Sequence, residues 1–426
     1  MPKELQVKIK EITERGVERV YPNKEALEKA LAAGKQLTFY CGFDPSAASL
    51  HIGNAIQLAK LSQLQAAGHK VIFLVGDFTG MIGDPTDKKA ARKQLDRATI
   101  KANCKTWKKQ ASAWLNFSGS NAAEIKYNSK WYDKMSLETF IKLGSYFTVQ
   151  QMMVRDMFQE RLKGVEKNIA PLTGQPTLSG LTYKFVTQEA KPIYLHEFLY
   201  PLIQGYDSVA LDVDGEIGGN DQTFNMLAGR DLMKAMTGKE KFVITSKLLV
   251  DNEGKKMGKS DGNIINLNET PANMYGQVMS WSDGVLASAF ELCTKLTWDE
   301  VKKVQERLKN TTLNPRDFKM KLAHEITKIY YGVKQADAAE ENFVKTVQNK
   351  EAPVDMEEVK ATDMNIIDLL IYIKLTNSKS EARRLVEQGG IKINNEVIKD
   401  SAHNVIIPAD GLVIQKGKRE YRRIIK

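Results

Sequence analysis

Two short apolar runs on either side of a helical segment constrain the fold of this chain more than any other feature. Residues 36–42 and 70–76 are rich in aliphatic and aromatic side chains, and residues 54–67 between them have the pattern of a helix. Two strands that one helix joins form a βαβ unit, and such units build parallel sheets. The sequence therefore predicts an α/β fold around a parallel sheet.

Later segments repeat this alternation. A strand is expected at 208–213 (SVALDV), then a turn (GEIGGNDQ), a helix over 223–236, and a further strand at 242–250 (FVITSKLLV). We therefore expect one α/β domain over about residues 30–265. Ligands of such sheets bind beyond the carboxyl ends of the strands, where these turns lie.

The remainder of the chain has a different pattern. Residues 274–342 carry apolar positions at helical spacing, and 346–363 are polar, contain Pro353 and are typical of a linker. Residues 364–426 predict a small unit of helices and alternating strands. The long loop-like stretch 164–192 is of the kind that carries function or is disordered.

The composition is that of an ordinary soluble protein, with 42% hydrophobic and 27% charged residues among 426. No run of 18 apolar residues is present, so no membrane span is expected. The N-terminal stretch lacks the apolar core of a signal peptide. The three cysteines lie far apart, which argues against a disulfide framework or a zinc knuckle and favours the cytoplasm.

The formal net charge of +10 permits binding to nucleic acid. A lysine-rich solvated surface explains the same charge equally well. The bases gather in 88–109 and in the last residues, KGKREYRRIIK.

The motif His51-Ile-Gly-Asn54 stands at a strand-to-helix turn. A helix N-terminus presents free N–H groups and suits an anion such as phosphate. Gly53 removes the Cβ that would block a close ligand, and His51 can donate to a phosphate oxygen. The alternative is a histidine that simply caps a helix.

A second motif, Lys256-Met-Gly-Lys259-Ser260, lies on a glycine-bearing loop. Two lysines three residues apart can clamp a polyphosphate and neutralise charge that develops in a reaction. The alternative is a solvated basic loop. Neither motif is a P-loop or a GxGxxG dinucleotide fingerprint.

Taken together, the two motifs resemble the HIGH and KMSKS signatures of class I aminoacyl-tRNA synthetases. The stretches FYCGFDPSAASLHIGN, GDFTGMIGDPT, YPLIQGYDSVAL, GGNDQ and SKLLVDNEGKKMGKS resemble bacterial-type tyrosyl-tRNA synthetase. The stretch SKSEARRLVEQGGIKINNEVI resembles the S4-like RNA-binding module of that family. The similarity runs from about residue 30 to the end, and 164–192 is unmatched.

The resemblance implies that the chain forms tyrosyl-adenylate from L-tyrosine and ATP with Mg²⁺, and then charges the 3′-terminal adenosine of tRNA(Tyr). It assigns tyrosine binding to Tyr40 and Asp207 at the phenol, Tyr200, Gln204 and Asp84 at the ammonium group, Gln222 near the carboxylate, and Thr79 beside the pocket. It assigns ATP binding to Cys41, Gly42, Asp44, Ser46, His51, Gly53, Asn54, Gly219, Asp221, Lys256, Lys259 and Ser260. Catalysis at the phosphates falls to His51, Asn54, Lys256, Lys259, Lys88 and Arg92. It assigns tRNA binding to Ser378, Lys379, Arg383, Arg384 and Lys392.

No dedicated metal site and no tightly bound cofactor are expected, because Mg²⁺ arrives with ATP. The resemblance implies a Rossmann-like catalytic domain at 1–240, with a connective and dimer-forming insertion at about 88–190. It places the KMSKS-type loop and a helical domain at 241–345, a linker at 346–363 and the S4-like domain at 364–426. A homodimer is also implied.

Some positions depart from the family pattern. Asn54 stands where many members have His, Ser46 where Thr is commoner, Gln57 where some have a smaller residue, and Asp87 where Gly is usual. Two residues also have simpler interpretations: Cys41 as a buried core thiol, and Asp207 as a surface residue of a helix.

Other functions stay open. A tryptophan-specific relative shares the core, a small-molecule adenylyltransferase shares the first signature, and an S4-type RNA-binding protein with an inactive core shares the tail. Asp207 and the S4-like tail argue against the first, the tail argues against the second, and the intact lysine pair argues against the third.

Overall fold

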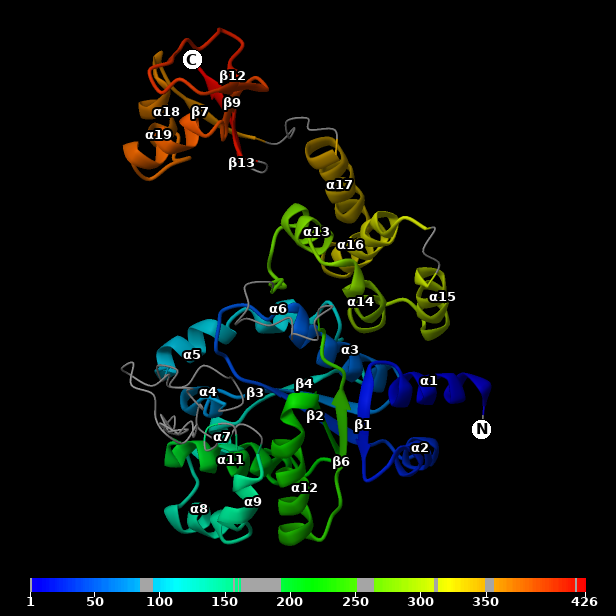
Figure 1. Cartoon of the computed structure of the whole chain (residues 1–426). Coiled ribbons are helices and arrows are strands. Elements are labelled where there is room, and N and C mark those ends of the chain that lie inside the picture. Colours follow the sequence, from blue (N-terminus) through cyan, green and yellow to red (C-terminus); the bar gives the residue numbers. More distant parts are fainter. Residues whose placement is uncertain are drawn as a thin grey trace, which may run out of the picture. The chain divides into compact units, whose positions relative to one another are not determined.

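The computed structural model describes residues 2–84, 95–155, 158–159, 161, 193–250, 264–309, 313–348, 356–417 and 420–426 (Figure 1). It divides into two units. The first comprises Met1–Glu269 and Trp281–Leu322, and the second Thr270–Ser280 and Ala323–Lys426. Within the described residues, no helix combines the length and the apolarity that crossing a bilayer requires.

A six-stranded sheet forms the centre of the first unit, in the order β1-β6-β5-β2-β3-β4. Its strands are β1 (Val17–Tyr21), β2 (Thr38–Phe43), β3 (Lys70–Val75), β4 (Glu124–Tyr127), β5 (Gly215–Gly219) and β6 (Phe242–Ser246). β2 and β3 pair in parallel from Thr38 opposite Lys70 to Phe43 opposite Val75, and β1 alone runs antiparallel to its neighbour. The predicted α/β fold and its first βαβ unit are confirmed.

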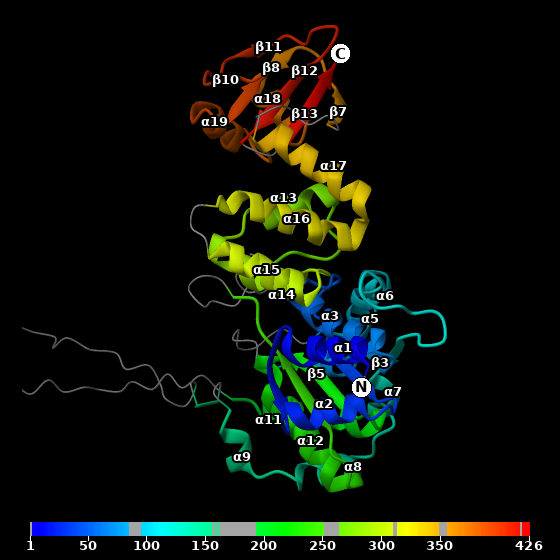
Figure 2. The same cartoon turned by 90° about the vertical axis from the view of Figure 1, so that its right-hand side faces the viewer.

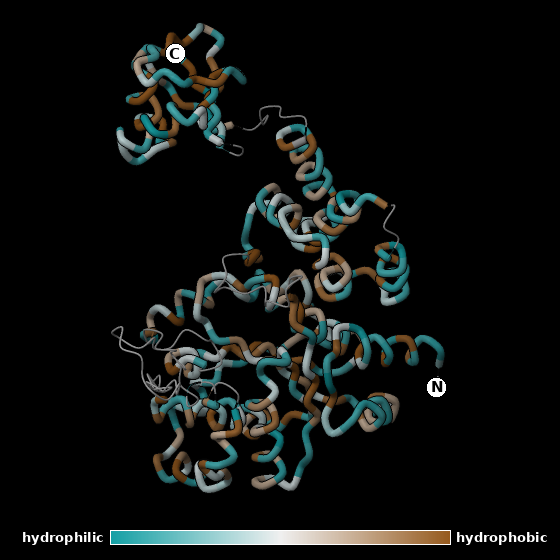
Figure 3. Tube along the Cα trace, viewed as in Figure 1, coloured by the Kyte–Doolittle hydropathy of each residue, from teal (hydrophilic) through white to brown (hydrophobic). Residues whose placement is uncertain are grey.

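Helices cover this sheet (Figures 1 and 2). The helix between β2 and β3 is α3 (Ile52–Ala66), as predicted, and it buries Leu58, Leu61 and Leu64. The other α-helices that lie wholly in the described part of the first unit are α1 (Lys3–Glu14), α2 (Lys24–Ala32), α4 (Thr79–Ile82), α5 (Arg97–Cys104), α6 (Trp107–Ala111), α7 (Ser129–Tyr132), α8 (Leu137–Gly144), α9 (Val149–Met153), α11 (Leu195–Leu211), α12 (Thr223–Thr237), α14 (Leu286–Cys293) and α15 (Trp298–Leu308). Hydrophilic and hydrophobic residues alternate along the helices in Figure 3, as helices with one face on a core require.

The strand predicted at 208–213 is wrong. α11 continues to Leu211 and ends at Asp212 in the left-handed conformation, and the strand is the glycine-rich segment Gly215–Gly219. Tertiary packing overrides the local pattern, because α11 and α12 approach closely. A Cβ on Gly205 would lie 2.9 Å from the backbone nitrogen of Gly229. The strand predicted at 242–250 is confirmed only to Ser246.

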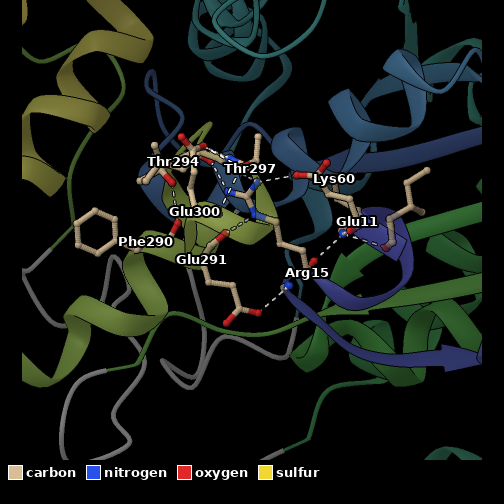
Figure 4. A network of polar contacts seen from close by, with 11 residues as sticks. Glu11, Arg15, Lys60, Phe290, Glu291, Thr294, Thr297 and Glu300 are labelled. Carbon is tan, nitrogen blue, oxygen red and sulfur yellow. Dashed lines mark hydrogen bonds and ion pairs between the residues drawn. The ribbon is translucent and has the colours of Figure 1, made fainter. Parts of the chain in front are cut away.

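The predicted domain boundary at residue 240 separates β6 from a sheet in which β6 lies between β1 and β5. The helical domain predicted to follow is itself divided, because α14 and α15 belong to the first unit. Arg15 explains this grouping (Figure 4). Its guanidinium donates to the carbonyl oxygens of Glu291 at 2.9 Å, Thr294 at 2.7 Å and Leu296 at 2.5 Å.

Figure 4 also shows how Lys60 attaches α3 to the C-terminal end of α1. The Lys60 ammonium donates to the carbonyl oxygens of Glu11, Ile12 and Arg15, at 3.1, 2.9 and 2.6 Å. It thereby satisfies carbonyls that the C-terminal end of α1 leaves without helical partners. Burial lowers the Lys60 pKa to about 7.

The second unit contains α13 (Pro271–Met279), α17 (Val333–Phe343), the short π-helix η4 (Val344–Gln348) and part of α16 (Pro315–Tyr331). A five-stranded sheet follows, in the order β10-β9-β12-β13-β7, with β8 and β11 forming a two-stranded ladder. The elements are β7 (Glu357–Lys360), β8 (Met364–Asn365), α18 (Ile366–Tyr372), α19 (Lys379–Glu387), β9 (Ile391–Ile393), β10 (Glu396–Ile398), β11 (Asn404–Val405), β12 (Leu412–Lys416) and β13 (Glu420–Ile425). The helices and alternating strands predicted in 364–426 are confirmed.

The linker predicted over 346–363 is wrong at its C-terminal end. β7 pairs in parallel with β13, and the ion pairs Arg422–Glu357 and Arg423–Glu358 join the two strands. The segment is polar because it forms an edge strand, and charged side chains are usual on such edges.

Candidate active site

His51 is the N-cap of α3. Its Nδ1 accepts from the backbone N–H of Asn54 at 3.3 Å, and Asn54 Oδ1 accepts from the backbone N–H of His51 at 3.0 Å. This reciprocal pair is a capping box, so the helix-capping interpretation is correct. A Cβ on Gly53 would lie 3.0 Å from the His51 ring, so Gly53 makes room for that ring.

The chain returns to this turn just after the segment 251–263. The backbone N–H of Ile52 donates to the Ile265 carbonyl at 2.9 Å, and that of Leu267 donates to the Leu50 carbonyl at 2.8 Å. The described residues that follow the second motif therefore lie against the first. Lys256, Lys259 and Ser260, like Lys88, Arg92 and Asp87, lie outside the described residues.

A chain of hydrogen bonds starts at the predicted ammonium site and runs through Asp44, which the sequence analysis placed at the nucleotide. Its carboxylate accepts from the Tyr200 hydroxyl and from Thr79 Oγ1, both at 2.6 Å. Thr79 Oγ1 accepts in turn from Asn128 Nδ2 at 2.9 Å, and the same Nδ2 lies 3.3 Å from Asp207 Oδ2. The predicted ammonium and phenol residues are thus connected.

Asp207 is buried on α11, with 3% of its surface exposed, so the alternative of a surface aspartate is wrong. Its Oδ1 accepts from Trp131 Nε1 at 2.9 Å and from the Tyr132 hydroxyl at 2.8 Å. Burial raises the Asp207 pKa to about 8, against the opposing effect of these donors.

A second cluster contains Asp84, Gln204 and Gln222, the remaining residues that are predicted to bind the substrate amino acid. Gln222 Nε2 donates to Asp84 Oδ2 at 2.6 Å. The buried Asn225 donates to Gln204 Oε1 at 2.8 Å and to Gln222 Oε1 at 3.0 Å. Two turns at the carboxyl ends of strands and one helix, α11, therefore bring Asp84, Gln204 and Gln222 together.

Tyr40, on β2, is 1% exposed, and its hydroxyl lies 2.9 Å from Ser208 Oγ. No hydrogen bond joins it directly to Asp207 within the described residues. Burial, followed by the charges of Glu216 and Asp207, raises the Tyr40 pKa well above its usual value. The two residues predicted at the phenol, Tyr40 and Asp207, are therefore linked indirectly, because Tyr40 contacts Ser208, the residue that follows Asp207.

The predicted ribose contacts lie beside α3. A Cβ on Gly219 would meet Asp221 Oδ1 at 2.5 Å and Gln57 Nε2 at 3.6 Å, and Gln57 Nε2 donates to Ser246 Oγ at 3.1 Å. Cys41 is 3% exposed and burial raises its thiol pKa, in agreement with the core-thiol interpretation.

Two further ATP positions, Gly42 and Ser46, lie at the end of β2 and in the turn after it. Gly42 is exposed on β2, and Ser46 donates its backbone N–H to the Asp44 carbonyl at 2.7 Å.

Several residues that hold this site are not predicted from the sequence. Asn128, Trp131 and Tyr132 occur in YNSKWYDKM, directly after β4. Aromatic residues with polar tips at the carboxyl end of a parallel strand were the available signal. No such signal marks Asn225, Ser208, Glu216 and Lys241, because their partners are distant in sequence.

The predicted tRNA-binding residues lie in the second unit. Ser378 caps α19 by accepting from the Glu381 N–H at 3.2 Å, and Lys379 pairs with Asp368 at 2.8 Å. Arg383 and Arg384 are exposed on the same helix, and Lys392 is half-buried on β9. No cluster of potential metal ligands occurs among the described residues.

Known families match most of the chain. The family described as tRNA synthetases class I (W and Y) matches residues 32–348, and the tyrosine–tRNA ligase SYY-like C-terminal domain matches 346–424. Tyrosine–tRNA ligase 2 of Clostridium acetobutylicum is 38% identical over 97% of this chain and 97% of its own length. The tyrosine–tRNA ligase of Thermotoga maritima is 38% identical over 100% of this chain and 98% of its own.

Two solved structures share the fold. The C-terminally truncated mitochondrial tyrosyl-tRNA synthetase of Coccidioides posadasii has a TM-score of 0.59 at 24% identity, covering 79% of this chain and 91% of that one. The tyrosyl-tRNA synthetase of Archaeoglobus fulgidus, complexed with L-tyrosine, has a TM-score of 0.57 at 19% identity, covering 79% and 99%.

Proposed function

The chain belongs to the class I tRNA synthetase family of the tryptophan and tyrosine enzymes and is a tyrosine–tRNA ligase, and we propose that its amino acid is activated in the pocket between Tyr200 and Asp207. The observation that carries this site is the hydrogen-bond chain Tyr200–Asp44–Thr79–Asn128–Asp207. It fixes one polar end suited to an ammonium group and another suited to a phenol.

Each end has the chemistry that tyrosine requires. Asp84, Gln204 and Tyr200 supply a carboxylate and neutral oxygen acceptors, which an ammonium ion needs. Asp207 and Tyr40 supply an acceptor and a hydroxyl for the phenol. Phenylalanine in this place would leave buried polar groups without partners, and the free-energy cost of that desolvation favours tyrosine.

We propose that the tyrosine carboxylate attacks the α-phosphorus of ATP directly, with pyrophosphate leaving. Catalysis then consists of positioning and of stabilising charge on the phosphates. Because His51 Nδ1 accepts a hydrogen bond, the neutral ring carries its proton on Nε2, which can donate to a phosphate oxygen. Mg²⁺ enters with ATP as part of the substrate. Lys256, Lys259, Lys88 and Arg92 remain proposed phosphate ligands.

Amino-acid-dependent exchange of pyrophosphate into ATP, without tRNA, tests this function. We expect L-tyrosine to support exchange and the other nineteen amino acids to support little. Exchange with L-tryptophan and not with L-tyrosine would instead identify the tryptophan-specific alternative. Transfer of tyrosine to tRNA(Tyr) in a second assay separates the ligase from a small-molecule adenylyltransferase.

We also propose that the enzyme works as a homodimer in the cytoplasm. The dimer is supported by four strongly exposed apolar residues of α8, α9 and their flank, because an interface would remove these side chains from water. They are Leu137, Ile141, Val149 and Val154, which are 65–72% exposed. The proposed compartment follows from the role in translation.

Light scattering after size-exclusion chromatography tests the dimer. We expect Ile141→Asp to convert a dimer into a monomer, because it places a charge in the interface. Val7→Asp is the matched control, since Val7 is 63% exposed on α1, and it should leave the mass unchanged. An Ile141→Asp protein that stays dimeric would place the interface elsewhere.

A further inference from the structure

A buried ion pair lies behind Tyr40. The Lys241 side chain is fully buried just before β6, and its ammonium pairs with the Glu216 carboxylate on β5. Tyr40 is the partner of Glu216 across the β2–β5 ladder, and the Lys241 Nζ lies 5.8 Å from the Tyr40 ring centroid. A buried ion pair is rarely a net source of stability, because both charges lose their hydration. Its position suggests a role in the pocket.

Ser208 connects this pair to Tyr40. Lys241 Nζ donates to Ser208 Oγ at 2.6 Å, and Ser208 Oγ lies 2.9 Å from the Tyr40 hydroxyl. Gly229 on α12 makes room for the contact, because a Cβ there would lie 2.6 Å from Lys241 Nζ and 2.9 Å from Ser208 Oγ. The packing of α11 on α12 therefore permits this arrangement.

The donors and acceptors that are present set the direction of these hydrogen bonds. An ammonium group only donates, so Ser208 Oγ accepts from Lys241. The Ser208 proton then has two acceptors, the Tyr40 oxygen at 2.9 Å and Glu216 Oε2 at 3.5 Å. The Tyr40 oxygen is the nearer, and 3.5 Å to Glu216 exceeds the usual length of a hydrogen bond between two oxygens. With Ser208 donating to it, Tyr40 has its own proton available for another acceptor.

We infer that Lys241 and Ser208 are positioning residues that direct the Tyr40 hydroxyl proton toward the phenol oxygen of bound tyrosine. The phenol proton goes to Asp207, the chain neighbour of Ser208. All donors then point one way, from the Lys241 cation to the Asp207 carboxyl group, and such aligned hydrogen bonds strengthen one another. This inference rests on the proposed tyrosine pocket and adds residues that decide its selectivity.

This relay of hydrogen bonds, from Lys241 through Ser208 to Tyr40, makes the pocket less tolerant of phenylalanine. The Tyr40 hydroxyl must then donate its proton to the bound amino acid. An amino acid whose side chain has no hydroxyl leaves this proton buried and without an acceptor, which is unfavourable. When Ser208 is replaced by alanine, the Tyr40 proton is no longer directed, so the binding of tyrosine weakens while the binding of phenylalanine is unchanged or improves.

Steady-state pyrophosphate exchange with Ser208→Ala tests the inference. We expect the KM for tyrosine to rise about tenfold, as the loss of one such hydrogen bond predicts. The kcat and the KM for ATP should stay unchanged, and the weak exchange with phenylalanine should stay the same or rise. Ser208→Thr, which keeps the hydroxyl, should restore most of the tyrosine affinity. Thr327→Val removes a buried hydroxyl in the second unit and should change none of these values.

A double-mutant cycle with Tyr40→Phe separates the relay from a purely structural effect. Ser208→Ala should have no further effect on the tyrosine KM when Tyr40→Phe is already present. Equal loss in both backgrounds, or equal loss for tyrosine and phenylalanine, would overturn the inference.

A second variant tests the inference in case Ser208→Ala does not fold. Lys241→Met combined with Glu216→Gln removes the cation without leaving an unpaired charge, and should raise the tyrosine KM selectively as well. An unchanged tyrosine KM in this double variant would also overturn the relay. Absence of tyrosine-dependent exchange in the unmodified protein would instead refute the proposed function.

Discussion

At the scale of single residues, Asp207 is the carboxyl group of the proposed pocket whose pKa burial raises into the neutral range. It is 3% exposed, and the donors to its carboxylate, Trp131, Tyr132 and Asn128, are all neutral. Neutral donors do not offset the cost of burying a charge, so the pKa rises to about 8. The carboxyl group is therefore mainly protonated at pH 7 and ionised at pH 9 in the absence of substrate.

This pKa predicts a pH-dependent affinity for tyrosine. An ionised carboxylate accepts a hydrogen bond from a phenol more strongly than a protonated one. The tyrosine dissociation constant, measured by calorimetry, should therefore fall as the pH rises from 6.5 to 8.5. Asp207→Asn does not titrate, so its affinity should be weaker and independent of pH in this range. The ATP dissociation constant serves as the control and should change little in the variant.

At the scale of elements, the first turn of α3 combines two roles in four residues. His51 and Asn54 cap each other's backbone N–H groups, and Gly53 leaves space for the imidazole ring. The aspartate and serine caps that usually begin helices are absent from this turn, and the histidine takes their place. The side chain that caps the start of the helix is therefore also the proposed phosphate donor.

Substitutions at position 54 should distinguish capping from catalysis. Asn54→Ala removes the acceptor for the His51 N–H and should lower the free energy of unfolding by about 1 kcal/mol. Asn54→His keeps a side-chain acceptor, so stability and exchange activity should stay close to those of the unmodified protein. Thermal unfolding and pyrophosphate exchange measure the two effects.

His51→Ala should behave differently from both substitutions, because it removes a cap and a proposed phosphate donor together. Adenylate formation should slow by about tenfold or more, which exceeds what loss of the cap explains. Near-normal activation by a folded His51→Ala protein would remove His51 from the proposed mechanism.

At the scale of the whole molecule, the C-terminal residues from β7 onward have a hydrophobic core of their own. The C-terminal core consists of aliphatic residues of α18, α19 and the five-stranded sheet, among them Ile366, Leu370, Val386, Ile391 and Ile414. A domain with its own core can be removed without exposing the core of another. We therefore expect truncation to separate tyrosine activation from tRNA binding.

Truncation after Gln348 removes the C-terminal domain, which matches the tyrosine–tRNA ligase SYY-like C-terminal family. Pyrophosphate exchange should stay within about twofold of the full chain, because every proposed tyrosine ligand remains. Charging of tRNA(Tyr) should fall strongly at limiting tRNA, because phosphate contacts supply much of nucleic-acid affinity. Full charging by the truncated protein would show that the basic residues of α19 contribute little to tRNA binding.

The sequence by itself determined the class of fold and most of the candidate site. The strands at 36–42 and 70–76, the helix between them and the C-terminal unit follow from periodicity, which reflects local burial. Tyr200 and Gln204, like the signature motifs, follow from a resemblance that needs no coordinates, and the spacing of these two residues places them on one helix face.

Only the tertiary structure decided the rest. The helical state of 208–211 depends on Gly205 meeting Gly229, and β7 exists because β13 lies beside it. The partners of Asp207 and the relay behind Tyr40 join residues from separate strands and helices. Such contacts have no period along the chain, because the packing of the sheet and of α11 on α12 creates them.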